Sequence, residues 1–402
     1  MERVKKAGGN LTNGYWGEQI GTETTLEPEL KTVELVKMTN DQVSKTINIG
    51  QLREHETAES PWFVVDGEVY DGTGFLKDHP GGGQSIVSAA GLDSSDEFSA
   101  IHSEVARAMM PEYHIGTLDE AGKAALKLSA EEPQKSDPSP TFLNAKYWKK
   151  AVLHSKKTVS WDSRIFTFKL EHEEQSLGLP IGQHLFIRLR DPADREAIIR
   201  SYTPISAPSR QGYMDVLVKL YFRSGEFKGG QMSQAVDSIP IGHFAEFKGP
   251  LGKFEYLGSG QCAINNAIRH VQTIVMICAG SGITPIFQVL RAAMEDASDT
   301  TQCIVMDCNR SEEDILCRKE LDRFGSDRSG RCRITHTLSE ALDSWQGRRG
   351  RIDQDLVREQ AGREQFCDGG ALALICGPKA FEQSVHQSLL DVGYSEDEML
   401  LF

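Results

Sequence analysis

The spacing of hydrophobic and polar positions changes along the chain and divides it into segments. Residues 1–40 show little periodic apolar pattern, and we expect a tail and linker there. Apolar residues at 62–65 and 69–70 flank Gly67 and predict a β-hairpin. Short helices are expected after it at 84–90, 95–98 and 102–110. Together these elements predict a small mixed α+β domain over 41–120.

A second pattern begins after a polar interruption. Residues 129–140 contain proline, serine and charged residues without core formers, so we place a linker over 121–141. Apolar and polar residues then alternate as in strands, which predicts an antiparallel barrel over 142–258. Its strands are expected at 164–170, 184–190, 213–221 and 245–249.

The last third alternates strand-like and helix-like runs. Such alternation predicts a doubly wound α/β domain, which we place at 259–402. Its strands are expected at 273–278, 302–308, 332–338 and 371–375. The whole chain is therefore predicted to be multidomain, and its 402 residues agree with roughly two to three domains of ~150 residues.

The composition and charge of the chain argue against several classes of protein. The longest apolar run, 273–279, is far shorter than the ~18–20 residues of a membrane helix, and the first residues lack the apolar core of a secretory signal. The net charge of −14 argues against a nucleic-acid partner. Residues 1–141 hold 12 Lys and Arg against 24 Asp and Glu, whereas the remainder holds 32 against 34. The acidic first third is either a solvated surface or a module that docks on a basic rim.

The eight cysteines all lie between Cys262 and Cys376, and none forms a CxxC pair. This spacing argues against a zinc ribbon, a covalently attached haem and a thioredoxin-like motif. Several lie in apolar runs and are expected to be buried thiols. Unpaired, buried thiols suit a reducing compartment, so we expect a cytoplasmic protein.

The first chemical motif contains His79-Pro80-Gly81-Gly82, with a second histidine, His102, 23 residues later. Taken alone, His-Pro-Gly-Gly is equally compatible with a plain turn. Two imidazoles on opposite faces of a planar group would form a bis-histidine haem iron site. The run from 61 to 118 resembles the cytochrome b5 domain in PWFVVDGEVYD, FLKDHPGG, EFSAIHS and YHIGTL. That resemblance implies a b-type haem with His79 and His102 as axial ligands, single-electron transfer, and a structural role for His114.

The second motif is Arg200-Ser201-Tyr202-Thr203-Pro204, followed by a turn at Gly229-Gly230. Arginine can grip a pyrophosphate, tyrosine can stack on an aromatic ring, and threonine can donate to a flavin nitrogen. The alternative is a strand and a glycine-rich turn without a ligand. The pair of motifs resembles the cytochrome b5 reductase branch of the ferredoxin reductase superfamily, although Gln231 stands where lysine is common. The resemblance implies that FAD is bound by Arg200, Ser201, Tyr202, Thr203, Val218, Lys219, Tyr221, Phe227, Met232 and Ser233.

The third motif is a strand that runs into a glycine-rich turn before a helix, where a pyrophosphate can approach the helix N-terminus. It comprises Gly280, Ser281, Gly282 and Thr284, and a second strand ends in Cys376-Gly377-Pro378. The alternative for Cys376 is a buried thiol. The resemblance implies an NAD(P)H site in which Thr203 and Cys376 serve hydride transfer, with Cys376 placing the nicotinamide without a covalent bond. Phe402, the terminal residue, either shields the flavin or is a packed end.

Nucleotide preference is expected to depend on residues near the adenosine ribose. A carboxylate there repels a 2′-phosphate. Here the residue after Trp345 is the neutral Gln346, and Arg348, Arg349 and Arg351 follow; Arg310 ends a neighbouring strand. The alternative is a basic surface loop. We expect NADPH to be used at least as well as NADH.

The order of haem, flavin and nicotinamide segments resembles the C-terminal part of fungal-type assimilatory nitrate reductase, with residues 1–18 similar to the end of its dimerisation region. This resemblance implies a molybdenum domain as electron acceptor, in cis or in trans, with cytochrome c and ferricyanide as acceptors in vitro. Molybdopterin and a homodimer are expected only for a longer form. Two alternatives stay open: a stand-alone NAD(P)H–cytochrome b5 reductase fusion with another acceptor, and a haem-binding carrier with an inactive reductase half.

Overall fold

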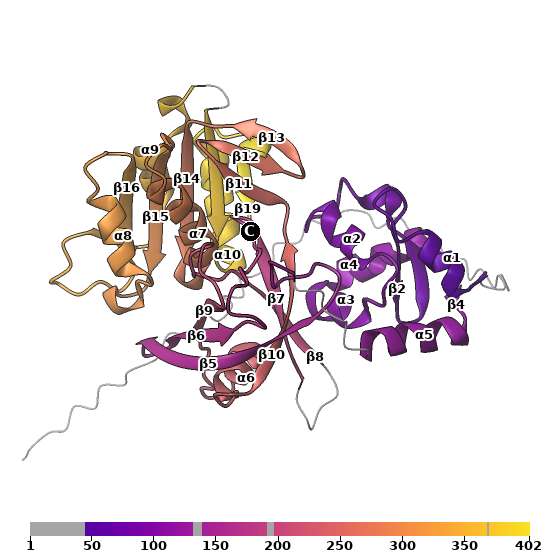
Figure 1. The fold of residues 1–402 in the computed structure, drawn as a ribbon. Coiled ribbons are helices and arrows are strands. Elements are labelled where there is room, and N and C mark those ends of the chain that lie inside the picture. The colour runs from indigo at the N-terminus through magenta and orange to yellow at the C-terminus, as the bar shows by residue number, and fades with distance from the viewer. Residues whose placement is uncertain (1–44, 132–138, 191–196, 368–369) are drawn as a thin grey trace, which may run out of the picture. The chain divides into compact units, whose positions relative to one another are not determined.

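The computed structural model describes residues 45–131, 139–190, 197–367 and 370–402. The expected tail at 1–40 lies outside these residues, as does most of the polar segment at 129–140. Within the described part of the chain, no helix is both long and apolar enough to cross a membrane. Figure 1 shows three successive groups of elements, which we call the haem domain, the FAD domain and the NAD domain.

The haem domain contains the predicted hairpin, with β2 (Trp62–Val65) antiparallel to β3 (Glu68–Asp71). The sheet order is β1-β4-β3-β2, with β1 (Thr46–Ile47) parallel to β4 (His114–Leu118). The helices are α1 (Ile49–Glu54), α2 (Gly83–Ala89), α3 (Ser95–Ile101), α4 (Glu104–Met109) and α5 (Glu120–Glu131).

Two expectations for this domain need correction. His102 does not start a helix: it is the extended C-cap residue of α3, and the next helix begins at Glu104. The linker expected at 121–141 is shorter, because α5 occupies its first half. Leu126 of α5 is buried in the core of the haem domain with Leu52, Val69 and Leu118. The haem domain therefore extends beyond residue 120, its predicted end, through helix α5 and its buried Leu126.

The FAD domain is built on a six-stranded sheet with antiparallel pairing and the order β8-β7-β10-β5-β6-β9. Its strands are β5 (Lys149–Ser160), β6 (Ser163–Lys169), β7 (His184–Arg190), β8 (Ala197–Tyr202), β9 (Tyr213–Lys219) and β10 (Phe244–Leu251). Helix α6 (Gln231–Ser238) lies between β9 and β10 along the chain. Alternate residues point into a core that includes Phe142, Phe166, Phe168 and Phe247. The long strand β5 was not expected, because eight of its twelve residues are lysine, serine, threonine or histidine.

A small antiparallel sheet joins the FAD and NAD domains. It contains β11 (Phe254–Gly258), β12 (Gln261–Ile264) and β13 (Ala267–His270). Asn265 and Asn266 form the turn between the last two strands, with φ of 48° and 66°. Asparagine tolerates this left-handed region, which two-residue hairpin turns require. This sheet was not predicted from the sequence pattern.

The NAD domain has a six-stranded parallel sheet in the order β17-β16-β15-β14-β18-β19, as the alternating pattern predicts. The strands are β14 (Thr273–Ala279), β15 (Gln302–Asn309), β16 (Cys332–Leu338), β17 (Arg348–Arg349), β18 (Ala371–Cys376) and β19 (Met399–Leu401). Helices α7 (Ile283–Glu295) and α8 (Arg318–Gly325) cover one face, and α9 (Gln354–Ala361) and α10 (Lys379–Asp391) cover the other (Figure 1).

The strand order reverses between β14 and β18. In open α/β sheets, ligands bind outside the carboxyl ends of the strands at such a reversal. The turn Gly280–Gly282 follows β14 and Cys376 ends β18, so the topology brings the two predicted nucleotide motifs to that edge. Short 3₁₀ helices complete the description: Thr73–Phe75, Met110–Tyr113, Gly280–Gly282, Glu312–Asp314, Arg363–Gln365 and Glu396–Glu398.

Candidate functional site

His79 and His102 face each other in the haem domain. Their ring centroids lie 5.9 Å apart with planes inclined by 41°. His79 Nδ1 is 3.0 Å from the Gly82 carbonyl oxygen, which leaves its Nε2 available. Phe98 stacks on His102 at 4.3 Å, and Phe75 meets His79 edge-on at 5.8 Å. The local sequence therefore places two imidazoles side by side against two phenylalanine rings, with Nε2 of His79 available to bind a metal.

The electrostatics of the pocket favour neutral imidazoles. Burial lowers the pKa of both histidines, and in His102 the neighbouring His79 lowers it further. Neutral imidazole is the form that binds iron. Nδ1 of His102 is buried and has no hydrogen-bond partner within the described ranges, which makes it an orphaned polar atom beside His79. Among the described residues, no group of three or more His, Cys, Asp or Glu side chains is placed to hold a metal ion.

His114 lies outside this pair. Its Nε2 is 2.7 Å from a carboxylate oxygen of Glu68, and its ring meets Tyr70 edge-on at 5.6 Å. Both contacts hold β4 against β3. This geometry agrees with the structural role expected for His114.

The flavin motif lies on β8 and the residue after it. Tyr202 is largely buried, which raises its pKa to about 12, and Thr203 is buried beside it. The Arg200 guanidinium is exposed, with Nη1 3.4 Å from the Ala100 carbonyl oxygen of the haem domain. Ser201 is also exposed on the same strand. Strand β8 thus exposes a guanidinium from Arg200 and a hydroxyl from Ser201, and it ends at the largely buried ring of Tyr202.

The glycine-rich turn leads into α6, as the sequence predicts. Ser233 accepts a hydrogen bond from the Tyr221 amide at 3.1 Å and donates to the Gly230 carbonyl at 3.1 Å, which fixes the turn. The side chains of Tyr221 and Phe227 are 47% and 49% exposed. Two exposed aromatic rings beside a helix N-terminus suit an adenine and its pyrophosphate.

Three other residues implied by the family resemblance have side chains that are already engaged. Val218 and Met232 are buried in the core of the FAD domain. Lys219 Nζ lies 2.6 Å from Asp162 and 3.3 Å from Asp314, the latter in the NAD domain. A role in binding FAD would therefore use their backbone atoms, whereas the Lys219 side chain links the two domains.

The nucleotide edge is tightly packed. A Cβ at Gly282 would lie 2.3 Å from the Cys376 carbonyl oxygen, so only glycine allows the turn to approach β18. Thr284 Oγ1 donates to the Ser281 carbonyl at 3.2 Å. Burial raises the pKa of Cys376 to about 12, which keeps the thiol protonated and agrees with a positioning role rather than a nucleophilic one.

Neighbouring groups hold the turn after Cys376 and the chain end. The Gly377 amide donates to Glu382 at 3.1 Å, and Pro378 is the N-cap residue of α10. Phe402 is half-buried, with its ring 5.8 Å from Phe254 in a T-shaped contact. The terminal aromatic residue is therefore packed against the small joining sheet, one of the two roles expected for it.

The arginines near the expected ribose site are largely occupied. Arg348 contacts Asp353 at 3.2 Å and Glu359 at 3.4 Å. Arg349 donates to four carbonyl oxygens of its own loop. Arg310 is exposed, with only a 3.8 Å contact to Glu340, and Gln346 is exposed as well. Arg351 is exposed too, so Arg310, Gln346 and Arg351 are accessible to a nucleotide.

A buried polar cluster joins the haem and FAD domains. Glu97 of α3 accepts from Lys248 Nζ and from the Trp148 indole, each at 3.0 Å. Burial raises the pKa of Glu97, but the Lys248 ammonium and the indole hydrogen bond outweigh it and keep the pKa below its ordinary value. Next to it, the more exposed Asp96 pairs with Arg190 at 3.0 Å. An acidic helix of the haem domain thus contacts basic residues of the FAD domain.

Comparison with known proteins agrees with this division. Family models match residues 49–119 (Cytochrome b5-like Heme/Steroid binding domain), 150–256 (Oxidoreductase FAD-binding domain) and 276–387 (Oxidoreductase NAD-binding domain). The crystal structure of the cytochrome b5 reductase domain of Ulva prolifera nitrate reductase is 33% identical, with a TM-score of 0.61. It covers 65% of this chain and is itself covered completely. This chain belongs to the nitrate reductase family.

Fungal members of the nitrate reductase family match along the whole chain. Nitrate reductase [NADPH] of Leptosphaeria maculans is 56% identical, and that of Aspergillus niger is 52% identical. The chain spans 45% and 46% of their respective lengths. It is an NAD(P)H-dependent oxidoreductase of this family, with domains for haem, FAD and NAD(P)H.

Sequence reasoning missed the residues that join the domains. Lys248, Gln288 and Arg291 belong to no nucleotide or haem motif, and Glu97, although it begins the EFSAIHS run, was not expected to contact another domain. Gln288 and Arg291 carried one weak signal, since they are polar positions inside the apolar run 283–293. A polar residue on a buried helix face needs a partner, but the sequence does not say which one.

Proposed function

We propose that this chain carries electrons from NADPH through FAD and a b-type haem to a molybdenum domain that reduces nitrate, in the cytoplasm. The observation that supports this most directly is the contact between α3 and β8. Helix α3 ends at His102, and β8 carries the flavin motif Arg200–Tyr202. One chain therefore brings a two-histidine pocket close to a flavin-binding strand. The fungal relatives are named as NADPH-dependent nitrate reductases.

The roles proposed for individual residues follow from their positions. Arg200 and the α6 N-terminus bind the FAD phosphates, and Tyr202 and Thr203 adjoin its ring. FAD, when bound, takes two electrons as hydride and releases them singly. Gly280, Ser281 and Gly282 accept the nucleotide pyrophosphate, and Cys376 orients the nicotinamide. His79 and His102 would hold a haem iron between their imidazoles, and the haem would supply single-electron transfer.

NADPH is proposed as the preferred donor. Gln346 has no negative charge to repel a 2′-phosphate, and the Arg310 guanidinium is exposed toward solvent at the end of β15. Because Arg348 and Arg349 are engaged with their own neighbours, the exposed Arg310 and Arg351 are the cations proposed to favour the 2′-phosphate. A homodimer is proposed only for the longer form of the protein.

The haem assignment is tested by replacing His102 with alanine in the purified, cofactor-loaded chain. We expect NADPH to reduce no haem in this variant, while ferricyanide reduction through FAD stays within about twofold of the parent. His114→Ala, which removes a histidine of the same domain outside the pocket, should retain haem and its reduction. Loss of ferricyanide activity in a folded His102 variant would contradict the proposed order of electron flow.

The acceptor is tested by supplying nitrate. We expect the chain alone to reduce ferricyanide and cytochrome c with NADPH but to leave nitrate unchanged. Adding a molybdenum domain from a fungal relative should restore nitrate reduction. Failure of that domain to accept electrons, while cytochrome c reduction is fast, would favour a stand-alone reductase with another acceptor.

A further inference from the structure

Helix α7 connects the nucleotide turn to the FAD domain. It starts at Ile283, directly after Gly282, and most of its buried residues are apolar. Gln288 and Arg291 are polar residues of the same helix that are buried as well, with only 4% and 9% of their surface exposed. A buried polar side chain costs folding free energy unless it finds a hydrogen-bond partner. Their partners therefore indicate why these residues are there.

Gln288 binds a backbone amide of the FAD domain. Its Oε1 accepts from the Gly182 N–H at 2.5 Å. Gly182 has φ of +92°, and a Cβ there would lie 2.4 Å from the Phe254 ring. The amide position is thus fixed by a backbone that only glycine adopts easily. Gly182 lies two residues before β7.

Arg291 binds two successive carbonyl oxygens of the FAD domain. Its Nη1 donates to Ile205 at 2.6 Å, and its Nη2 donates to Ser206. Both residues lie in the loop directly after Tyr202 and Thr203 of the flavin motif. Burial lowers the pKa of Arg291. A planar guanidinium can span two carbonyls, whereas the single ammonium of lysine cannot reproduce that geometry.

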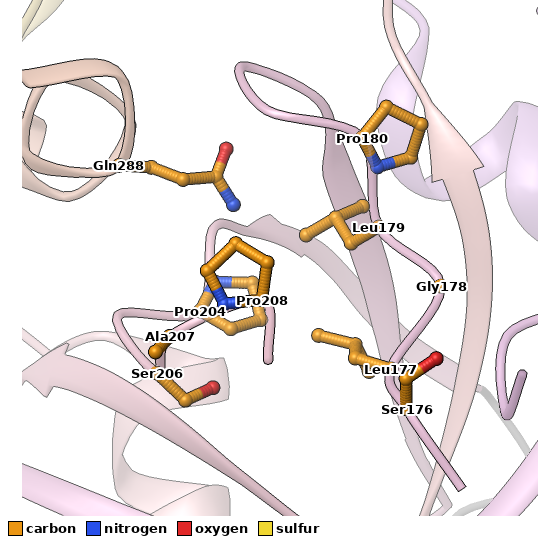
Figure 2. A pocket seen from close by; sticks show the side chains of 10 residues that line it. All are labelled: Ser176, Leu177, Gly178, Leu179, Pro180, Pro204, Ser206, Ala207, Pro208 and Gln288. Atoms are coloured by element: carbon orange, nitrogen blue, oxygen red, sulfur yellow. The ribbon is translucent and has the colours of Figure 1, made fainter. Parts of the chain in front are cut away.

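Both contacts reach the same end of one strand pair. Strands β7 and β8 are antiparallel neighbours with Leu185 opposite Tyr202, so the segment before β7 and the loop after β8 lie together. A cavity of about 240 Å³ separates the two segments beside α7. Figure 2 shows Gln288 projecting from its helix toward them, with Leu179 and Pro204 on either side. Gln288 and Arg291 of α7 hydrogen-bond both segments at this end of the strand pair, where Ile181 and Ile205 also pack against the apolar core around α7.

We propose that Gln288 and Arg291 form a clamp that fixes the nucleotide turn relative to the flavin strand; this rests on the proposed hydride transfer from NADPH to FAD. Both are positioning residues, since neither touches a cofactor motif directly. Arg291 lies nine residues beyond Gly282, about 13.5 Å along a rigid helix at 1.5 Å per residue. Hydride transfer needs reacting atoms about 3–3.5 Å apart, and an error of about 1 Å can cost about 100-fold in rate.

The test uses Arg291→Lys and Gln288→Met in the cofactor-loaded chain. The matched control is Arg331→Lys: Arg331 Nη1 also donates to two backbone carbonyls, Ala293 and Asp299, but both belong to the NAD domain. We expect the clamp variants to bind FAD fully and to show 10- to 100-fold slower flavin reduction by NADPH. The effect should appear in kcat more than in KM, with a larger isotope effect for deuterated nicotinamide. The control should change by less than about threefold.

A second readout does not depend on turnover. Hydrogen exchange at the Gly182 amide, measured without NADPH, should be faster in both clamp variants than in the parent and in Arg331→Lys. Unchanged flavin reduction in a variant with faster exchange would overturn the proposal, as would equal slowing by the control. If Arg291→Lys does not fold, Gln288→Met alone decides by the same criteria. If NADPH fails to reduce the parent chain, the proposed function is wrong, whereas the exchange result still reports on the clamp.

Discussion

The haem pocket and the junction between the FAD and NAD domains are built in opposite ways. His79 and His102, the proposed haem ligands, lie 23 residues apart, with Phe75 and Phe98 from the same short segment around them. At the junction, Gln288 meets a residue 106 positions away and Arg291 meets one 86 positions away. The first site depends on local sequence, and the second depends on how distant elements pack. The two regions should therefore respond differently to mutation.

The largest effect is expected from Gly282→Ala at the junction. The new Cβ would lie 2.3 Å from the Cys376 backbone oxygen, so the turn or β18 must move. We expect flavin reduction by NADPH to fall by about 100-fold or more and stability to fall by about 1–3 kcal/mol. Stopped-flow flavin reduction and thermal unfolding measure the two effects, while haem reduction by dithionite should be unchanged.

Gly325→Ala is the matched control in the same domain. Its Cβ would meet Ile334 no closer than 3.6 Å, an ordinary contact. We expect no loss of activity. If both glycine variants behave alike, the junction is less constrained than the close approach of the turn to β18 indicates.

An intermediate effect is expected from Glu97→Gln between the haem and FAD domains. The change leaves the buried Lys248 ammonium without its carboxylate, and uncompensated buried charge is costly. We expect haem reduction by NADPH to slow by about tenfold or more, with ferricyanide reduction unchanged. Asp96→Asn, which removes the half-exposed partner of Arg190, should slow haem reduction by less than about threefold.

The stabilisation from the ion pair between Glu97 and Lys248 depends on pH in a defined way. The pKa of Glu97 is below its ordinary value of 4.5 in the folded protein. Its stabilisation is therefore fully present above that value and is lost as pH falls through the lower, folded-state pKa. In the parent chain, haem reduction relative to ferricyanide reduction should decline in that acid range. A decline of equal size in Glu97→Gln would assign it to another group.

The smallest effect is expected at the exposed nucleotide rim. Gln346→Asp adds a carboxylate near the expected 2′-phosphate, so the ratio of kcat/KM for NADPH to that for NADH should fall, by up to about tenfold. Because the rim is solvated, added salt should reduce the change. The measurement uses ferricyanide as acceptor. A clear preference of the parent chain for NADH would show that the exposed Arg310 does not face the ribose.

The sequence predicted what local pattern and family motifs determine. Eight expected strands are present with ends within two residues, because alternating and continuous apolar runs identify half-buried and fully buried strands. The haem histidines and the turn at Gly280–Gly282 were recognised because each motif lies within a short segment. His102 was misplaced within a helix, since the helical spacing around it does not show where α3 ends.

The pattern of hydrophobic and polar positions and the motifs did not predict which side chains contact one another in the folded chain. Lys219 was expected to bind FAD, yet its ammonium lies between Asp162 and Asp314, about 57 positions before it and 95 after it. Even partners close in the sequence were not predicted: Arg348, expected at the ribose, pairs with Asp353 and Glu359, which lie 5 and 11 positions after it. A charged side chain can pair with any oppositely charged group that the fold brings near it, and those groups are known only from the folded structure.

The eight cysteines, all free, differ in one respect that matters for handling the protein. Burial raises the thiol pKa of seven of them, so the reactive thiolate is scarce. Cys367 alone is exposed. The NAD domain therefore resists alkylation and peroxide at its core while offering one chemical handle at its surface. A single fluorophore or spin label could be attached there without introducing or removing a residue.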